Sequence, residues 1–137
     1  MSSTSKGDDK IRFRTTDPKN REIIMKEQTW TEHIAPRHNE TDEIKIQKNI
    51  ENPSLIVRNM KRNDNGELII DEKREDYIGL INYSTADGKQ SLKIIKTIVE
   101  IVDDENGFVV TNYILRNLKE IKTEGGIVYD SKESINL

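Results

Sequence analysis

The chain has 137 residues, of which 33% are hydrophobic and 34% are charged, and its formal net charge is −3. It contains no cysteine, which excludes disulfides and thiolate chemistry, and no apolar run of about 18 residues, which excludes a helical membrane span. A protein that holds nucleic acid through its overall field is usually basic, so this chain would have to bind any polyanion in a local pocket.

The first part of the sequence predicts a tail followed by a hairpin. Residues 1–9 are small and polar and predict a flexible tail ahead of a single domain, 10–137. Because the first ten residues lack the apolar stretch of a signal peptide, we expect a cytoplasmic site of action. Residues 11–16 alternate in the manner of a half-buried strand, and a turn over 17–20 would return the chain as a second strand, 21–26.

Two short helices are expected next. Thr29 and Glu32 have the spacing of a capping box, Trp30 and Ile34 would share the buried face, and Pro36 would end this helix. A second helix is predicted over about 41–51, with Thr41 as its cap and Ile46 and Ile50 toward the core.

From residue 54 onward the pattern favours strands joined by short turns. The predicted strands are 54–61, 67–70, 76–84, 91–102 and 108–116. The segment 91–102 is apolar on both faces, as a central strand would be, and the charged run 72–76 is interpreted as a solvated turn with weak ion pairs. Residues 124–130 fit either an edge strand or a tail. The expected class is α+β, with two or three N-terminal helical segments packed on an antiparallel sheet.

The scarcest reactive groups of the chain gather in "TWTEHIAPRHNE", residues 29–40, which holds the single tryptophan and both histidines. A histidine can accept a proton in one step and return it in another, and Arg37 offers a planar cation that matches phosphate oxygens. Two plainer interpretations stay open. His33 and His38 could be exposed residues that hold a helix connection together, or they could join Glu40 as metal ligands, although this spacing matches no common zinc motif.

Several stretches, taken in order, are similar to a known group of proteins: "WTEHIAPRHNE", "IENPSLIV", "DYIGLINY", "LKIIKTIVEIV" and "FVVTNYILR". Over roughly residues 10–118 the chain resembles the phage- and mobile-element-encoded ribonucleases of the barnase, EndoU, colicin and RelE-like superfamily. The order of these short motifs carries the resemblance more than any one of them.

The resemblance implies helices packed against an antiparallel sheet and metal-independent cleavage of RNA, without a cofactor. It makes His38 the first candidate for general acid or base and His33 a second, with Arg37 to stabilise phosphate charge. Thr111 matches a hydroxyl residue on a late strand and could donate to a phosphate oxygen. Tyr113 falls on the same face of that strand and is a candidate for stacking or proton transfer. A strand also favours threonine and tyrosine without any catalysis.

Three arginines are possible further phosphate contacts: Arg58, Arg74 and Arg116. The sequence therefore leads to the hypothesis of an endoribonuclease, with tRNA as a candidate substrate, that acts as a toxin or effector and is a candidate for delivery from another cell. Its partners would be RNA and a cognate immunity or antitoxin protein, with no membrane. The alternatives are a non-catalytic binding module of the same fold, which the acidic balance favours, and an immunity or antitoxin protein itself.

Overall fold

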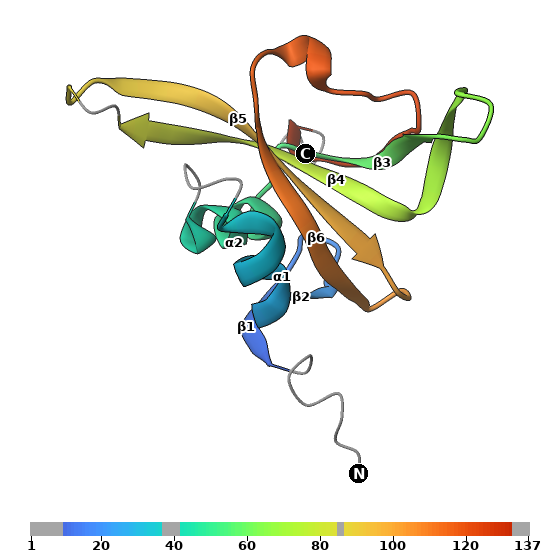
Figure 1. Ribbon diagram of the computed structural model, residues 1–137, viewed down its shortest axis with the longest axis horizontal. Helices are drawn as coiled ribbons and strands as arrows, with labels where there is room; N and C mark the ends of the chain where they lie inside the picture. The colour runs from blue at the N-terminus through green and yellow to red at the C-terminus, as the bar shows by residue number, and fades with distance from the viewer. Residues whose placement is uncertain (1–9, 37–41, 85–86, 133–137) are drawn as a thin grey trace.

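The computed structural model describes residues 10–36, 42–84 and 87–132, and these form one seven-stranded sheet with short helices (Figure 1). The elements in chain order are β1 (Ile11–Thr16), β2 (Glu22–Lys26), α1 (Glu27–Thr29), the π-helical turn η2 (Trp30–Ile34), α2 (Glu43–Glu51), β3 (Leu55–Arg62), β4 (Leu68–Ser84), β5 (Gln90–Ile101), β6 (Asn106–Leu115), the 3₁₀ turn η3 (Leu118–Glu120) and β7 (Ile127–Asp130).

The strand order is β1-β2-β6-β5-β4-β3-β7, which places β5 in the middle of the sheet, as its two apolar faces predict. Strands β2 and β6 pair in parallel, and the other strand pairs that the described residues form are antiparallel. The N-terminal hairpin β1–β2 thus joins the same sheet as the meander β3–β6, and β7 adds an edge strand beside β3.

The expected fold class, helices packed on an antiparallel sheet, is wrong. The protein is dominated by its mixed sheet, with 53% of residues in strands and two short helices that account for 19%. One reason is the hairpin, which lies in the sheet through the parallel β2–β6 pairing. Another is the charged run 72–76, interpreted as a turn, which lies within the 17-residue strand β4: residues 75 and 76 pair with both β3 and β5, and the pairing with β3 shifts register at residues 72–74.

The two helical segments differ from the prediction in how they begin. The first starts at Glu27, directly after β2, and Lys26 is its N-cap without a side-chain hydrogen bond, so the capping box predicted at Thr29 is wrong. Helix α2 is capped by Asp42, whose Oδ1 accepts from the backbone N–H of Lys45 at 2.8 Å. Thr41, the predicted cap, lies outside the described residues.

The core lies between these helices and one face of the sheet. Ile34, Ile46 and Ile50 are fully buried, as their helical spacing predicts, and they meet inward side chains of the strands. The buried cluster consists of Ile23, Met25, Ile34, Ile46, Ile50, Ile56, Tyr77, Ile95, Val99 and Val109. In Figure 1 α1 and α2 lie below the point where the long strands cross, whereas the chain between β6 and β7 runs across the top of the view.

A chain of amide and hydroxyl groups fixes α2 to the middle of the sheet. Asn49 donates from Nδ2 to the backbone oxygen of Tyr77 at 2.9 Å and to Oγ1 of Thr97 at 3.0 Å, and Thr97 in turn donates to Oδ1 of Asn112 at 2.7 Å. Gly79 makes this approach possible, since a Cβ at that position would collide with Oδ1 of Asn49 and reach 3.3 Å from its Cγ.

A second buried polar cluster ties the turn before β2 to β4. Arg21 donates from Nε to Asp17 at 2.9 Å and from one terminal nitrogen to Glu75 at 2.7 Å and to the Tyr77 hydroxyl at 3.0 Å. The Tyr77 hydroxyl donates to Asp17 at 2.5 Å. Burial raises the pKa of Tyr77, and the hydrogen bond to Asp17 adds to that effect, so the hydroxyl stays a neutral donor.

Candidate functional site

The face of the sheet opposite the core cluster carries a group of polar side chains, here called the polar face. Side chains alternate along a strand, so the pairing register assigns each residue to one face. Thr111 pairs with Ile98, which pairs with Asp76, and Tyr113 pairs with Lys96 in the adjacent row. The polar face consists of Arg74, Asp76, Lys96, Glu100, Thr111 and Tyr113.

His33 lines a hollow at the β2–β6 end of this surface. The hollow measures about 310 Å³ and is lined by Lys26, Thr29, His33, Glu100, Phe108, Val109 and Val110. The imidazole of His33 is exposed at the end of η2, and the Lys26 ammonium lies 4.6 Å from the centre of the Phe108 ring. This hollow therefore combines a titratable ring with a cation and a carboxylate.

Tyr113 lines a second hollow of about 570 Å³, between β3, β5, β6 and the chain that follows β6. Lys96 places its ammonium 5.7 Å from the centre of the Tyr113 ring. Asn59 and Arg116 line the same hollow, and Asn59 donates from Nδ2 to Oδ1 of Asp76 at 2.7 Å. Thr111 lies on β6 between Val110, which borders the His33 hollow, and Tyr113.

Asp76 is a buried carboxyl on this face, with 3% of its surface exposed. Burial raises the pKa of Asp76 above its usual range, opposed by the hydrogen bond from Asn59 and the positive charge of Lys96, while the charge of Asp71 raises it further. Carboxyls with a raised pKa beside a hollow are typical of functional sites, although structural networks produce them too.

The unfolding free energy of an Asp76→Asn variant, minus that of the wild type, should increase as the pH rises from about 4 to 7. The raised pKa means that Asp76 contributes most to stability when it is protonated, below its ordinary pKa, and that this contribution is lost as the pH rises through the folded-state value. Each pKa unit between the two states corresponds to about 1.4 kcal/mol. Urea unfolding at several pH values measures the difference, with Asp64→Asn at an exposed turn position as control. A difference that stays constant or shrinks with pH would contradict the assignment.

The structure brings together part of the predicted site. His33 borders the first hollow, Thr111 and Tyr113 share the polar face, and Arg116 lines the hollow of Tyr113. The first candidate for acid or base, His38, and its neighbour Arg37 lie outside the described residues, as does Glu40.

Two of the three arginines predicted as phosphate contacts, Arg58 and Arg74, already have partners within the protein. Arg74 lies 3.6 Å from Glu100 and 4.0 Å from Asp71, so it forms ion pairs on the polar face itself. Arg58 donates to the backbone oxygen of Gly125 at 3.5 Å, next to the chain that leads to β7. Neither lines the His33 hollow or the Tyr113 hollow.

Sequence reasoning missed five polar residues of this surface and its two hollows: Lys26, Asn59, Asp76, Lys96 and Glu100. For Lys96 a signal was present, because it is two residues from Ile94 and from Ile98 along a predicted strand and therefore shares their face. Asp76 could not be singled out from the sequence, because it belongs to the charged run 72–76, which was interpreted as a solvated turn. Nothing in the sequence pairs Asn59 with Asp76, which lie on different strands.

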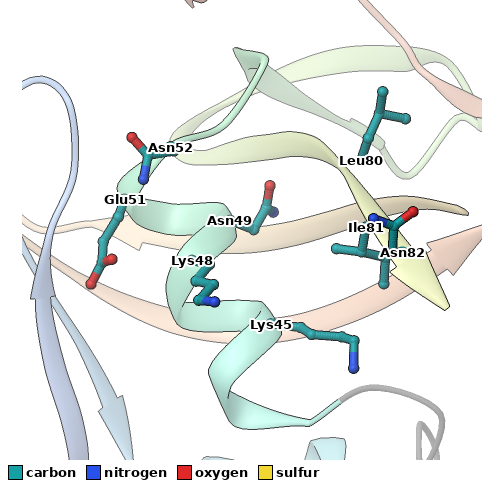
Figure 2. A pocket seen from close by; sticks show the side chains of 8 residues that line it. All are labelled: Lys45, Lys48, Asn49, Glu51, Asn52, Leu80, Ile81 and Asn82. Atoms are coloured by element: carbon teal, nitrogen blue, oxygen red, sulfur yellow. The ribbon is translucent and has the colours of Figure 1, made fainter. Parts of the chain in front are cut away.

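A third hollow, of about 520 Å³, lies between α2 and the far end of β4. Its walls include Lys45, Lys48, Asn49 and Asn82, and Figure 2 shows Lys45 reaching from the helix toward the part of β4 that carries Asn82. The Lys45 ammonium is paired with Asp42 at 3.1 Å. No predicted site residue lines this hollow, so we place the candidate site on the polar face.

Comparisons with protein-family models, curated proteins and solved structures found no match to this chain. Within the described part of the chain, no group of three histidine, aspartate or glutamate side chains is arranged to hold a metal ion. No helix in that part is long and apolar enough to cross a membrane.

Proposed function

We propose that the protein is a metal-independent endoribonuclease that acts as a toxin or effector. The observation that carries this proposal is the position of the exposed His33 imidazole in a hollow that Lys26 also lines, with Thr111 directly following Val110, another lining residue, along β6. The similarity of the histidine-bearing segment and the late strand to the mobile-element ribonucleases supports it from the sequence side. We assign the second member of the acid–base pair, in addition to His33, to His38.

The proposed reaction transfers the phosphate within the RNA itself. One histidine accepts the proton of a 2′-hydroxyl, whose oxygen forms a bond to the adjacent phosphorus as the bond from phosphorus to the 5′-oxygen breaks. The other histidine donates a proton to the departing 5′-oxygen. Lys26, Arg37 and Thr111 would stabilise the charge on the phosphate oxygens, because preorganised donors act most strongly where charge develops. The products carry a 2′,3′-cyclic phosphate and a 5′-hydroxyl.

A His38→Ala variant should cut RNA roughly 10²- to 10⁴-fold more slowly than the wild type, the range expected for one general acid or base. The assay incubates protein with total RNA and with tRNA in excess chelator and detects fragments with 2′,3′-cyclic phosphate ends. His33→Ala tests the second histidine in the same way. Thr111→Val should slow cleavage as well, and Thr16→Val, which removes an exposed hydroxyl from β1, is its matched control.

Three results would contradict parts of the proposal. Equal cutting by wild type and His38→Ala would remove His38 from its role, and equal loss in Thr111→Val and Thr16→Val would remove Thr111. If the wild type cuts no RNA, the ribonuclease proposal fails. Expression in a host cell gives a further test, since toxicity should disappear with His38→Ala. A toxic ribonuclease also requires a cognate inhibitor in the producing cell, and we include such a partner in the proposal.

A non-catalytic binding module, whose partner is a protein or an RNA, is the second candidate. The Glu100 carboxylate favours it, because this residue lines the same hollow as His33 and would repel a phosphate at that point. The net charge of −3 favours it as well. Filter binding of labelled RNA in chelator separates the two, because this candidate predicts binding without fragments and no effect of His38→Ala on either.

A further inference from the structure

The hollow of Tyr113 combines the groups with which proteins hold a single-stranded base. Its volume of about 570 Å³ falls in the range of small-molecule sites. Tyr113 contributes an aromatic ring whose residue is 39% exposed, and Lys96 and Arg116 contribute two positive charges. Unpaired bases in RNA are recognised by stacking on aromatic rings and by hydrogen bonds to their edges, while cations bind the backbone.

Asn59 is held in one orientation within this hollow. Its Nδ2 donates to Asp76 at 2.7 Å, and a carboxylate only accepts hydrogen bonds, so the amide nitrogen must face Asp76. The Oδ1 atom and the second N–H of Asn59 then point away from that carboxylate, and the described residues offer them no further hydrogen bond. An amide oxygen beside an amide N–H is the pair that reads a base edge.

The acidic residue of the hollow accepts hydrogen bonds from the backbone beside it. Glu120 accepts from the backbone N–H of Arg116 at 2.6 Å and from that of Asn117 at 3.1 Å, as part of the capping box of η3. Its carboxylate is therefore engaged by two local donors. The Lys96 ammonium and the Arg116 guanidinium remain as the groups of the hollow suited to an anionic backbone.

We propose that this hollow binds one unpaired nucleobase of the RNA and that Asn59, positioned by Asp76, determines which base is accepted. Tyr113 would contact the face of the base, and Lys96 and Arg116 the flanking phosphates. This inference rests on the proposed function, because it adds a base-selective subsite next to the proposed cleavage site. Asn59 is a specificity residue, and Asp76 acts through it as a positioning residue.

The test measures binding without cleavage. Wild-type protein is titrated against labelled 2′-O-methyl oligomers of A, of C and of U, which lack the attacking hydroxyl, and fluorescence anisotropy gives three dissociation constants. We expect at least a fivefold preference for one oligomer in the wild type. Asn59→Ala should reduce this preference to about twofold or less, and Tyr113→Ala should weaken binding of all three by roughly fivefold or more.

Further variants separate base reading from damage to the fold. Asn59→Ser retains a small polar side chain that is too short to reach a base, so it should lose the preference, and its melting temperature shows whether the fold is intact. Asp76→Asn can donate to Asn59 as well as accept, which frees the amide to rotate, so the preference should change while overall affinity stays within about twofold. Asn65→Ala, at an exposed turn position, is the matched control and should behave as the wild type.

The outcomes distinguish this inference from the ribonuclease proposal. A wild type without preference, or Asn59→Ala and Asn59→Ser variants that keep the wild-type preference, would overturn the subsite even if the protein cuts RNA. An Asn59-dependent preference in a protein that cuts no RNA would support the subsite and contradict only the catalytic proposal. In a protein that does cut RNA, the base enriched beside the cut should change in Asn59→Ser.

Discussion

An Arg21→Met variant should lose about 3–5 kcal/mol of unfolding free energy, because removing one partner of a buried ion pair leaves an uncompensated charge. The Arg21 side chain is only 6% exposed and donates to Asp17, whose side chain is fully buried, and to Glu75. Methionine fills a similar volume but donates no hydrogen bond, so both carboxylates would lose their cation. Urea unfolding monitored by circular dichroism measures the effect.

Arg14→Met is the matched control for this prediction. Arg14 lies on the neighbouring strand, its side chain is 57% exposed, and its nearest acidic partner, Glu22, is 3.7 Å away. Exposed pairs of this kind contribute about 0–1 kcal/mol, so the control should remain close to the wild type. If Arg21→Met and Arg14→Met unfold at the same urea concentration, the buried cluster does not stabilise the fold in the way described.

Gly79→Ala is expected to lower the unfolding free energy by about 2–4 kcal/mol, combining overpacking of the core with damage to a buried hydrogen-bond network. The added methyl group would occupy the space of Asn49 Oδ1, and Asn49 is held by hydrogen bonds to Tyr77 and Thr97. Either the amide leaves its position or α2 moves away from the sheet. The same unfolding measurement applies.

A double-mutant cycle with Asn49→Ala tests this cause directly. If the collision with Asn49 is responsible, adding Gly79→Ala to an Asn49→Ala background should leave stability unchanged or raise it, because alanine loses less conformational freedom in a strand than glycine. Additive losses from the two substitutions would show that Gly79 is needed for another reason. The cycle therefore identifies which contact makes glycine necessary in the middle of β4.

The two buried clusters and the candidate site share one strand. Residues 75 and 77 face the core side, where they join Arg21, whereas Asp76 faces the polar side, where it holds Asn59. Because side chains alternate along β4, the residues that stabilise the core and the residue that positions Asn59 are neighbours in the sequence but lie on opposite faces. Substitutions on the core side should change unfolding, and those on the polar side should change RNA binding with smaller effects on stability.

Local patterns in the sequence were sufficient for most individual elements. Local composition, alternation and turn signals predicted β1, β2, β3, β5 and β6 close to their observed bounds, and the spacing of Ile46 and Ile50 predicted the buried side of α2. The same alternation predicted that Thr111 and Tyr113 share a face. These features depend on residues that are neighbours along the chain, so the period of the pattern already contains them.

Only the tertiary structure decided how these elements combine. The charged run 72–76 has the composition of a turn, yet it lies within a strand, because Glu75 and Asp76 pair with both β3 and β5 and the charge of Glu75 is bound by the distant Arg21. The parallel β2–β6 pairing and the contact of Asn59 with Asp76 likewise join segments that are far apart in the sequence. No local period encodes such contacts, so the sheet order, and with it the polar face that carries the candidate site, could be known only from the folded chain.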